Sequence, residues 1–169
     1  GANKKIFASQ YPGQCVSVDQ LESSTEGFYG QMKGKLTKRR YKYATVFVDQ
    51  FSRFTYIHLQ STLSSAETIE AKENFETKAK EAGVEIEHYH ADNGRFADNA
   101  YREHCKTKGQ SLTFCGVNAH WQNGVAERAI RDIKENSRSI LFHAMNKWPG
   151  AISVFLWPYA MRHAVNLRN

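Results

Sequence analysis

The sequence predicts an α/β domain built on a mixed five-stranded sheet that is flanked by helices. Two β-prone runs, residues 43–48 and 54–59, are separated by only a short connection, which predicts an antiparallel hairpin. The later strands alternate with capped segments of helical periodicity. The expected order is βββαβαβαα, with the first three strands antiparallel. A length of 169 residues suits one well-packed domain.

The opening residues indicate a linker. Residues 1–14 are polar and contain Pro12-Gly13, so we expect a linker that leads into a single core domain over residues 15–169. The sequence opens on Gly1-Ala2 without an initiator methionine, and it closes without a helix stop signal. We therefore expect it to be a piece of a longer protein.

Each element follows from local residue chemistry. A Ser/Thr/Gly-rich stretch over 23–34 indicates a turn region. Ser64 and Ser65 can cap a helix that reaches residue 82, with Gly83 as its stop. Trp148-Pro149-Gly150 should break the helical last third of the chain. The expected strands are 15–21, 43–48, 54–59, 84–91 and 111–114, and the expected helices are 65–82, 97–108, 125–146 and a final one to the end.

Composition narrows the class of protein. Hydrophobic residues make up 41% and charged residues 24%, which is ordinary globular usage and excludes wholesale disorder. The net charge of +6 and the pI near 9.2 permit binding to a polyanion. No apolar run approaches the roughly 18 residues of a membrane span, so no membrane partner is expected. Cys15, Cys105 and Cys115 lack metal or disulfide spacing and indicate reduced packing residues.

Three carboxylates stand out as candidate catalytic and metal-binding residues. Asp19 lies late in the first expected strand, and Asp92 follows the fourth. Two strand ends can meet at one side of a sheet. Glu127 lies at the start of the long helix in the last third. Either Asp taken alone could simply shape a turn. The pattern of the helix that carries Glu127 favours a functional role instead.

The helix that begins near Glu127 predicts a basic ridge. At about 100° per residue, Arg131, Lys134 and Arg138 fall on the same narrow side as Glu127. A separate apolar stripe must face the core; it contains Ile130, Ile133, Ile140, Leu141 and Ala144. Glu127 and Arg131 could be an ordinary surface pair. That interpretation does not explain why four successive turns carry Glu, Arg, Lys and Arg on one side of the helix. Such a stripe would let the carboxylate contact a metal ion while the neighbouring cations contact phosphates.

Carboxylates that converge repel one another unless cations hold them. Hard oxygen ligands favour Mg²⁺ or Mn²⁺ over softer metals. Two such ions can activate an attacking hydroxyl and stabilise the leaving oxygen of a phosphodiester. The sequence therefore indicates a two-ion site formed by Asp19, Asp92 and Glu127.

The motifs around these carboxylates resemble those of integrase catalytic cores from retroviruses and LTR retrotransposons, in particular the copia-type branch. The acidic triad matches the DDE signature of these enzymes. The similarity extends to the sequence motifs in and beyond the triad, which are FVDQFSR at 47–53, HADNG at 90–94, QNGVAER at 122–128 and LWPYA at 156–160.

The resemblance implies an RNase H-like fold and a Mg²⁺-dependent enzyme that trims DNA 3′ ends and joins them to target DNA. It implies Asp19, Asp92 and Glu127 as the metal ligands and a structural role for Asp49. The implied partners are element DNA ends, target DNA, further copies of the chain in a dimer or larger multimer, and zinc-binding and C-terminal domains of the same protein. The implied location is the nucleus, after assembly in the cytoplasm.

Further residues are candidates for DNA contact. Arg128 neighbours Glu127 and joins the basic ridge of Arg131, Lys134 and Arg138 as a candidate phosphate contact. The loop before the helix offers stacking and hydrogen-bonding groups, although its Trp121 could equally be a packed anchor. The loop candidates are His120, Gln122 and Asn123.

Three alternatives remain open at the level of sequence. His88, His90 and Asp92 alternate on one expected strand, which permits a zinc hydrolase, although no further ligand cluster is evident. An RNase H-like nuclease could cut DNA without joining it. A domesticated domain could serve only for dimerisation or targeting, although the intact triad speaks against it.

Overall fold

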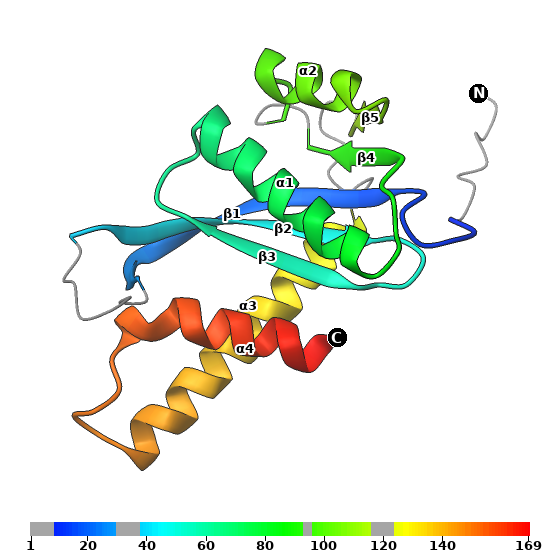
Figure 1. The fold of residues 1–169 in the computed structure, drawn as a ribbon. Coiled ribbons are helices and arrows are strands. Elements are labelled where there is room, and N and C mark those ends of the chain that lie inside the picture. The colour runs from blue at the N-terminus through cyan, green and yellow to red at the C-terminus, as the bar shows by residue number, and fades with distance from the viewer. Residues whose placement is uncertain (1–8, 30–37, 93–95, 116–123) are drawn as a thin grey trace.

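The computed structural model of the chain describes residues 9–29, 38–92, 96–115 and 124–169. They contain five strands, four α-helices and a short 3-10 helix, η2 (Val154–Leu156), before the last α-helix (Figure 1). Across these residues, no helix combines the length and apolar character that crossing a membrane requires.

The strands form one mixed sheet in the order β3-β2-β1-β4-β5. The first three strands, β1 (Val16–Phe28), β2 (Arg40–Asp49) and β3 (Thr55–Gln60), are antiparallel. The other two, β4 (His88–Ala91) and β5 (Ser111–Phe114), extend the sheet in parallel with β1. The predicted fold class, a mixed five-stranded sheet flanked by helices with three antiparallel strands first, is confirmed.

The helices cover both faces of the sheet. Figure 1 shows α1 (Ser65–Glu81) and α2 (Asn99–Thr107) on one side, and α3 (Gly124–Lys147) and α4 (Trp157–Arg168) on the other. The start of α1 is fixed by the predicted cap, because Ser64 Oγ accepts a hydrogen bond from Glu67 N at 3.2 Å. Gly83 follows that helix with φ of 76°, a conformation that favours glycine.

Two hydrophobic cores result from the alternation of side chains along β2. Val46 packs on the α3 side with Ala129 and Ile133, whereas Phe47 packs on the α1 side and stacks on Phe75 with ring centroids 4.7 Å apart. Burying a side chain such as Ile133 contributes roughly 1.5–3 kcal/mol. The sheet is therefore held from both sides, and α3 is positioned across the end of β1.

The prediction of a turn beginning at residue 23 is wrong, because β1 continues to Phe28. Its end pairs with the start of β2 after a register irregularity between Glu22 and Gly27. The distant helix α4 supports this extension, since Trp157 Nε1 donates to the Thr25 carbonyl oxygen at 2.7 Å. Local turn propensity is thus overruled by a tertiary contact.

The fourth strand is shorter than predicted. It begins at His88 rather than at residue 84, because the preceding segment contacts the N-terminal residues. Glu87 N donates to the Gly13 carbonyl oxygen at 2.8 Å, and the Tyr11 hydroxyl donates to Glu87 Oε2 at 2.7 Å. A Cβ on Gly13 would lie 2.1 Å from the Glu85 carbonyl oxygen, so this close approach requires glycine.

Candidate active site

Asp19 and Asp92 lie next to each other on adjacent parallel strands. Val18 of β1 pairs with Ala91 of β4, and each aspartate is the next residue along its strand. Because side chains alternate along a strand, both carboxylates lie on the sheet face opposite to Val18 and Ala91. That is the face of Val46, which pairs with Asp19 and packs against α3.

Glu127 lies in the first turn of α3, on the same side of the sheet. The helix is anchored by its buried neighbours Ala126, Ala129 and Ile130. Glu127 itself is half-buried, as are Asp19 and Asp92. The start of α3 is therefore fixed near the sheet by packing, while the carboxylate keeps access to solvent.

The thiol of Cys115 is affected by the charges of all three carboxylates. Burial raises the pKa of this thiol, and the negative charges of Asp92, Glu127 and Asp19 raise the pKa further. All three carboxylates therefore lie within electrostatic range of one sulfur atom. Cys115 N donates to the Ala91 carbonyl oxygen at 3.0 Å, which holds the residue beside the end of β4.

Sequence reasoning missed Cys115 as a site residue. Cysteine is a common buried packing residue, and that is how we interpreted all three cysteines. The position of Cys115 at the end of β5 is the one available signal, because that strand lies next to the one that carries Asp92. Its Sγ also lies 3.5 Å from His90 Nε2, so it joins a polar strip on the same face of the sheet.

The three carboxylates suit a divalent metal in their chemistry. All are hard oxygen donors, two are neighbours in strand register, and the third lies at the start of the facing helix. In the described part of the chain, no group of three or more His, Cys, Asp or Glu side chains could hold an ion as the side chains stand. Asp19 Oδ1 accepts a hydrogen bond from Gln20 N at 2.8 Å, which orients this carboxylate.

Asp49 has structural partners, as the resemblance implied. Its buried carboxylate accepts hydrogen bonds from Gly13 N at 2.8 Å and from Ser52 N and Oγ, both at 2.7 Å. These bonds tie the β2–β3 connection to the N-terminal segment and account for the buried charge.

The histidines of β4 do not supply a zinc site. His88 Nε2 and His90 Nδ1 both contact Thr113 Oγ1, at 2.7 and 2.8 Å. The two rings do share one face of the strand, as predicted. Among the described residues, His88, His90 and Asp92 do not form a group that could hold a metal ion as the side chains stand.

The basic ridge is exposed along α3. Arg128, Arg131, Lys134 and Arg138 are all exposed, whereas Ile133 of the same helix is buried. The predicted separation between a basic and an apolar stripe is thus confirmed. The loop candidates His120, Gln122 and Asn123 lie outside the described residues.

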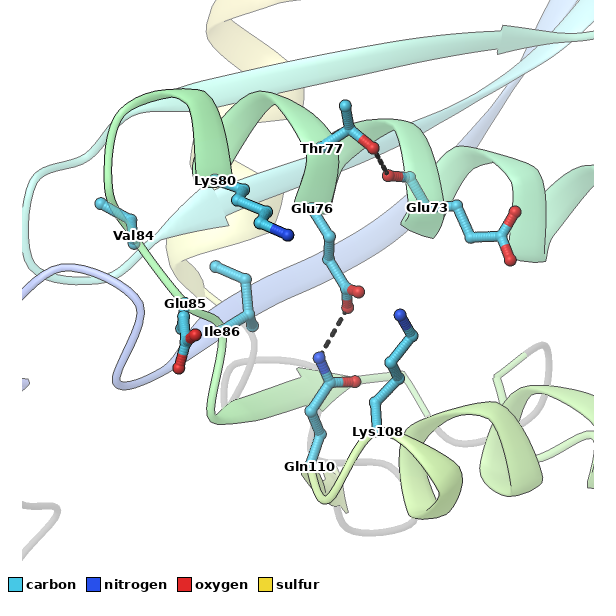
Figure 2. A pocket seen from close by; sticks show the side chains of 9 residues that line it. All are labelled: Glu73, Glu76, Thr77, Lys80, Val84, Glu85, Ile86, Lys108 and Gln110. Atoms are coloured by element: carbon cyan, nitrogen blue, oxygen red, sulfur yellow. Dashed lines mark hydrogen bonds between the residues drawn. The ribbon is translucent and has the colours of Figure 1, made fainter.

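A pocket of about 550 Å³ lies away from the carboxylates, on the α1 side of the sheet (Figure 2). Its lining mixes acidic and basic side chains from α1, the segment before β4 and the end of α2. Figure 2 shows Glu76 and Gln110 bonded across it. The pocket shares no residue with the carboxylate cluster, and its acidic and basic side chains do not form a set of like donors for one ion. The carboxylate cluster is therefore the better candidate active site.

Comparisons with known proteins identify relatives in sequence and in structure. No family model matches the chain. In sequence, the chain is 31% identical over 137 residues to a retrovirus-related Pol polyprotein from transposon RE1 of Arabidopsis thaliana, an alignment that covers 79% of the chain. The chain spans only 9% of the length of that relative.

Solved structures share the fold. The catalytic core domain of HTLV-2 integrase, determined with magnesium in a trimeric form, superposes with a TM-score of 0.60 at 22% identity, over 91% of this chain and 83% of that one. The chain has the fold of an integrase catalytic core. An intasome of simian T-cell lymphotropic virus matches with a TM-score of 0.68 at 18% identity, over 95% of this chain and 49% of that one.

A third integrase core, from BIV, matches with a TM-score of 0.58 at 16% identity, over 90% of this chain and 81% of that one. The structural similarity therefore covers at least 90% of this chain in each of the three comparisons. The resemblance to retroviral and LTR-retrotransposon integrase cores, inferred above from the motifs, is confirmed, and with it the RNase H-like fold.

Proposed function

We propose that the chain is the catalytic core of an LTR-retrotransposon integrase, which trims the 3′ ends of element DNA and joins them to target DNA. The observation that carries this proposal is the strand register that sets Asp19 and Asp92 side by side, with Glu127 in the first turn of α3 on the same side of the sheet. The sequence similarity to a retrotransposon Pol polyprotein and the integrase-core fold support it.

The chemistry proposed is phosphodiester exchange. In end trimming, water forms a bond to a phosphorus atom of the element strand, and the 3′-oxygen leaves. In joining, the freed 3′-hydroxyl loses its proton and bonds to a phosphorus atom of the target strand, whose own 3′-oxygen leaves. No oxidant or reductant is required.

Asp19, Asp92 and Glu127 would hold the divalent ions, which the HTLV-2 core structures with magnesium suggest are Mg²⁺, with Mn²⁺ as a substitute. When bound, two such ions supply activation of the attacking oxygen and charge stabilisation at the leaving oxygen. The protein contributes position: paired strands align the two aspartates, and the packed start of α3 presents the glutamate to them.

We propose that the integrase core acts as a dimer or larger multimer. The HTLV-2 cores were determined in dimeric and trimeric forms. The connection between α3 and α4 carries exposed apolar side chains suited to an interface: Trp148 is 53% exposed and Phe155 is 42% exposed. Zinc-binding and C-terminal domains of the same protein, with element and target DNA, would complete the complex, which would assemble in the cytoplasm and act in the nucleus.

A branched DNA substrate tests the proposed reaction. A strand-transferring enzyme should resolve a branched integration product and rejoin the target strand when supplied with Mn²⁺. We expect the purified chain to yield the rejoined strand on a denaturing gel. Nicks without rejoining would identify an RNase H-like nuclease instead, and the absence of any cleavage would favour a non-catalytic dimerisation or targeting domain.

The basic ridge makes a separate prediction about DNA binding. Replacing exposed Lys134 with alanine should weaken duplex binding and lower the salt dependence of the binding constant by about one counterion, because one phosphate contact is lost. The measurement is Kd against salt concentration. Lys106→Ala on α2 is the matched control, since that exposed lysine lies on the opposite side of the sheet. An unchanged slope for Lys134→Ala would show the ridge to be ordinary solvated surface.

A further inference from the structure

The sheet ends at β5, and a groove lies there between this edge strand and α2. The groove encloses about 330 Å³, and Figure 1 shows the two elements next to each other. Its lining residues are Arg102, Cys105 and Lys106 of α2, Leu112 and Phe114 of β5, and Gln110 of the connection between them. None of these six is acidic. The groove therefore sets a backbone edge beside a positively charged helix face.

Hydrogen bonding identifies which backbone groups of β5 point away from the sheet. Ser111 N donates to the Glu87 carbonyl oxygen at 3.0 Å, and Cys115 N, four residues later, donates to a β4 carbonyl oxygen at the same distance. Main-chain groups point alternately to the two sides of a strand, so Leu112 and Phe114 turn their N–H and C=O outward. Among the residues that the structure describes, these outward groups have no hydrogen-bond partner. The edge is therefore open to a further strand.

The two cations of the groove lack a carboxylate partner. Arg102 and Lys106 are both exposed, and within the described part of the chain neither forms an ion pair. The Arg102 guanidinium lies 5.1 Å from the centroid of the Phe114 ring, which holds it over the strand. Both side chains are thus placed to bind acidic groups that lie along the β5 edge.

The spacing of these cations matches the spacing of side chains on a strand. Arg102 and Lys106 are one turn apart on α2, a rise of about 6 Å along the helix. Residues i and i+2 of a strand share one face and lie about 6.6 Å apart. Leu112 and Phe114 are such a pair, and they line the same groove. A strand added beside β5 would therefore present every second side chain at the spacing of the two cations.

The charge of the chain favours a different protein over a second copy as the occupant. The net charge is +6. Pairing of β5 with β5 of another copy would bring Arg102 and Lys106 of both copies to one edge, and such like charges repel. An acidic segment from another protein complements the groove instead.

We propose that the β5 edge binds an extended acidic segment of a partner protein, which adds to the sheet as a further strand and places two carboxylates on Arg102 and Lys106. Main-chain hydrogen bonds to Leu112 and Phe114 would supply affinity, and acidic side chains at alternate positions would supply selectivity. This interaction surface is distinct from the carboxylate cluster and does not depend on the proposed catalytic function.

Peptide binding tests the charge requirement. The probe is a short, end-capped, fluorescently labelled peptide that alternates glutamate with threonine, titrated with the purified chain and followed by anisotropy. The comparison peptide alternates lysine with threonine. We expect the lysine peptide to bind at least about tenfold more weakly, because it replaces two attractions by two repulsions.

Two N-methylated forms of the glutamate peptide test the strand geometry. One carries N-methyl groups on the glutamate nitrogens and the other on the threonine nitrogens. A bound strand turns only alternate N–H groups toward its neighbour. We therefore expect one form to bind at least about tenfold more weakly and the other to bind like the unmodified peptide.

Paired charge reversals locate the site. Arg102→Glu combined with Lys106→Glu should weaken binding of the glutamate peptide by about tenfold or more. Lys80→Glu combined with Lys108→Glu is the matched control. It changes the net charge equally at two exposed lysines that line the pocket of Figure 2 and not this groove, so the affinity should stay unchanged.

Four results would overturn the proposal. Failure of the glutamate peptide to bind would show that the cations only protect an edge strand from pairing. Equal binding of the two N-methylated forms would exclude strand addition, and equal weakening by the two double variants would place the peptide elsewhere. Displacement of the peptide by a single-stranded oligonucleotide, whose own binding the Arg102/Lys106 reversal weakens to the same degree, would assign the groove to nucleic acid instead.

Discussion

Replacing Glu127 with glutamine is expected to abolish strand joining while DNA binding persists. Glutamine keeps the shape of the side chain but removes the negative charge and one metal-binding oxygen. Losing several kcal/mol of charge stabilisation in the transition state corresponds to a rate loss of about a thousandfold. Binding to duplex DNA should not weaken, because the variant removes a charge that repels phosphate.

Glu135→Gln is the matched control for this variant. Glu135 is an exposed glutamate of the same helix, so the same substitution there tests for any general effect on α3. Both variants should be compared by a joining assay and by DNA binding, in the chain restored to its flanking domains. Joining by Glu127→Gln at the rate of Glu135→Gln would remove Glu127 from the catalytic site.

Local sequence predicted much of the fold, because the determining signals are local. Short β-prone runs defined β2 and β3, and Ser64 and Gly83 bounded α1 as expected. Asp19, near the start of β1, and Asp92, directly after β4, lie side by side because Val18 and Ala91 pair in a parallel register.

What sequence could not supply are contacts between distant segments. The extension of β1 depends on Trp157, which bonds to Thr25 from the far end of the chain. The proximity of Cys115 to the carboxylates depends on the pairing of β4 with β5 and on the position of α3. Neither can be recognised from the residues that neighbour Cys115 in the sequence.

Lys72 and Glu76 form an ion pair between successive turns of α1, on the side that faces the core. Lys72 is fully buried, and its Nζ lies 2.8 Å from Glu76 Oε1 and 2.8 Å from His104 Nδ1. Glu76 also accepts hydrogen bonds from the Tyr89 hydroxyl at 2.6 Å and from Gln110 Nε2 at 2.7 Å, the latter drawn in Figure 2. One carboxylate thus accepts from three donors that lie in α1, in β4 and in the connection between α2 and β5.

Replacing Glu76 with alanine is expected to destabilise the fold by about 3–5 kcal/mol, because it leaves a buried ammonium group without its counter-charge. Lys72→Met should cost less, since it removes the charge that needs a partner and keeps an apolar stem of similar length. Glu81→Ala is the matched control. Its pair with Lys78 on the same helix is exposed, and its loss should cost less than about 1 kcal/mol.

The pH dependence of stability separates this ion pair from a packing effect. Burial raises the pKa of Glu76, but hydrogen bonds from Lys72, Tyr89 and Gln110 outweigh it and hold the pKa below its ordinary value. A carboxyl group with a lowered folded-state pKa stabilises the fold above its unfolded pKa, and this contribution is lost as the pH falls through the folded pKa. The difference in unfolding free energy between wild type and Glu76→Ala, measured by urea denaturation, should therefore shrink in acid. If it stays constant with pH, or if Glu76→Ala costs no more than Glu81→Ala, the charge on Glu76 does not stabilise this core.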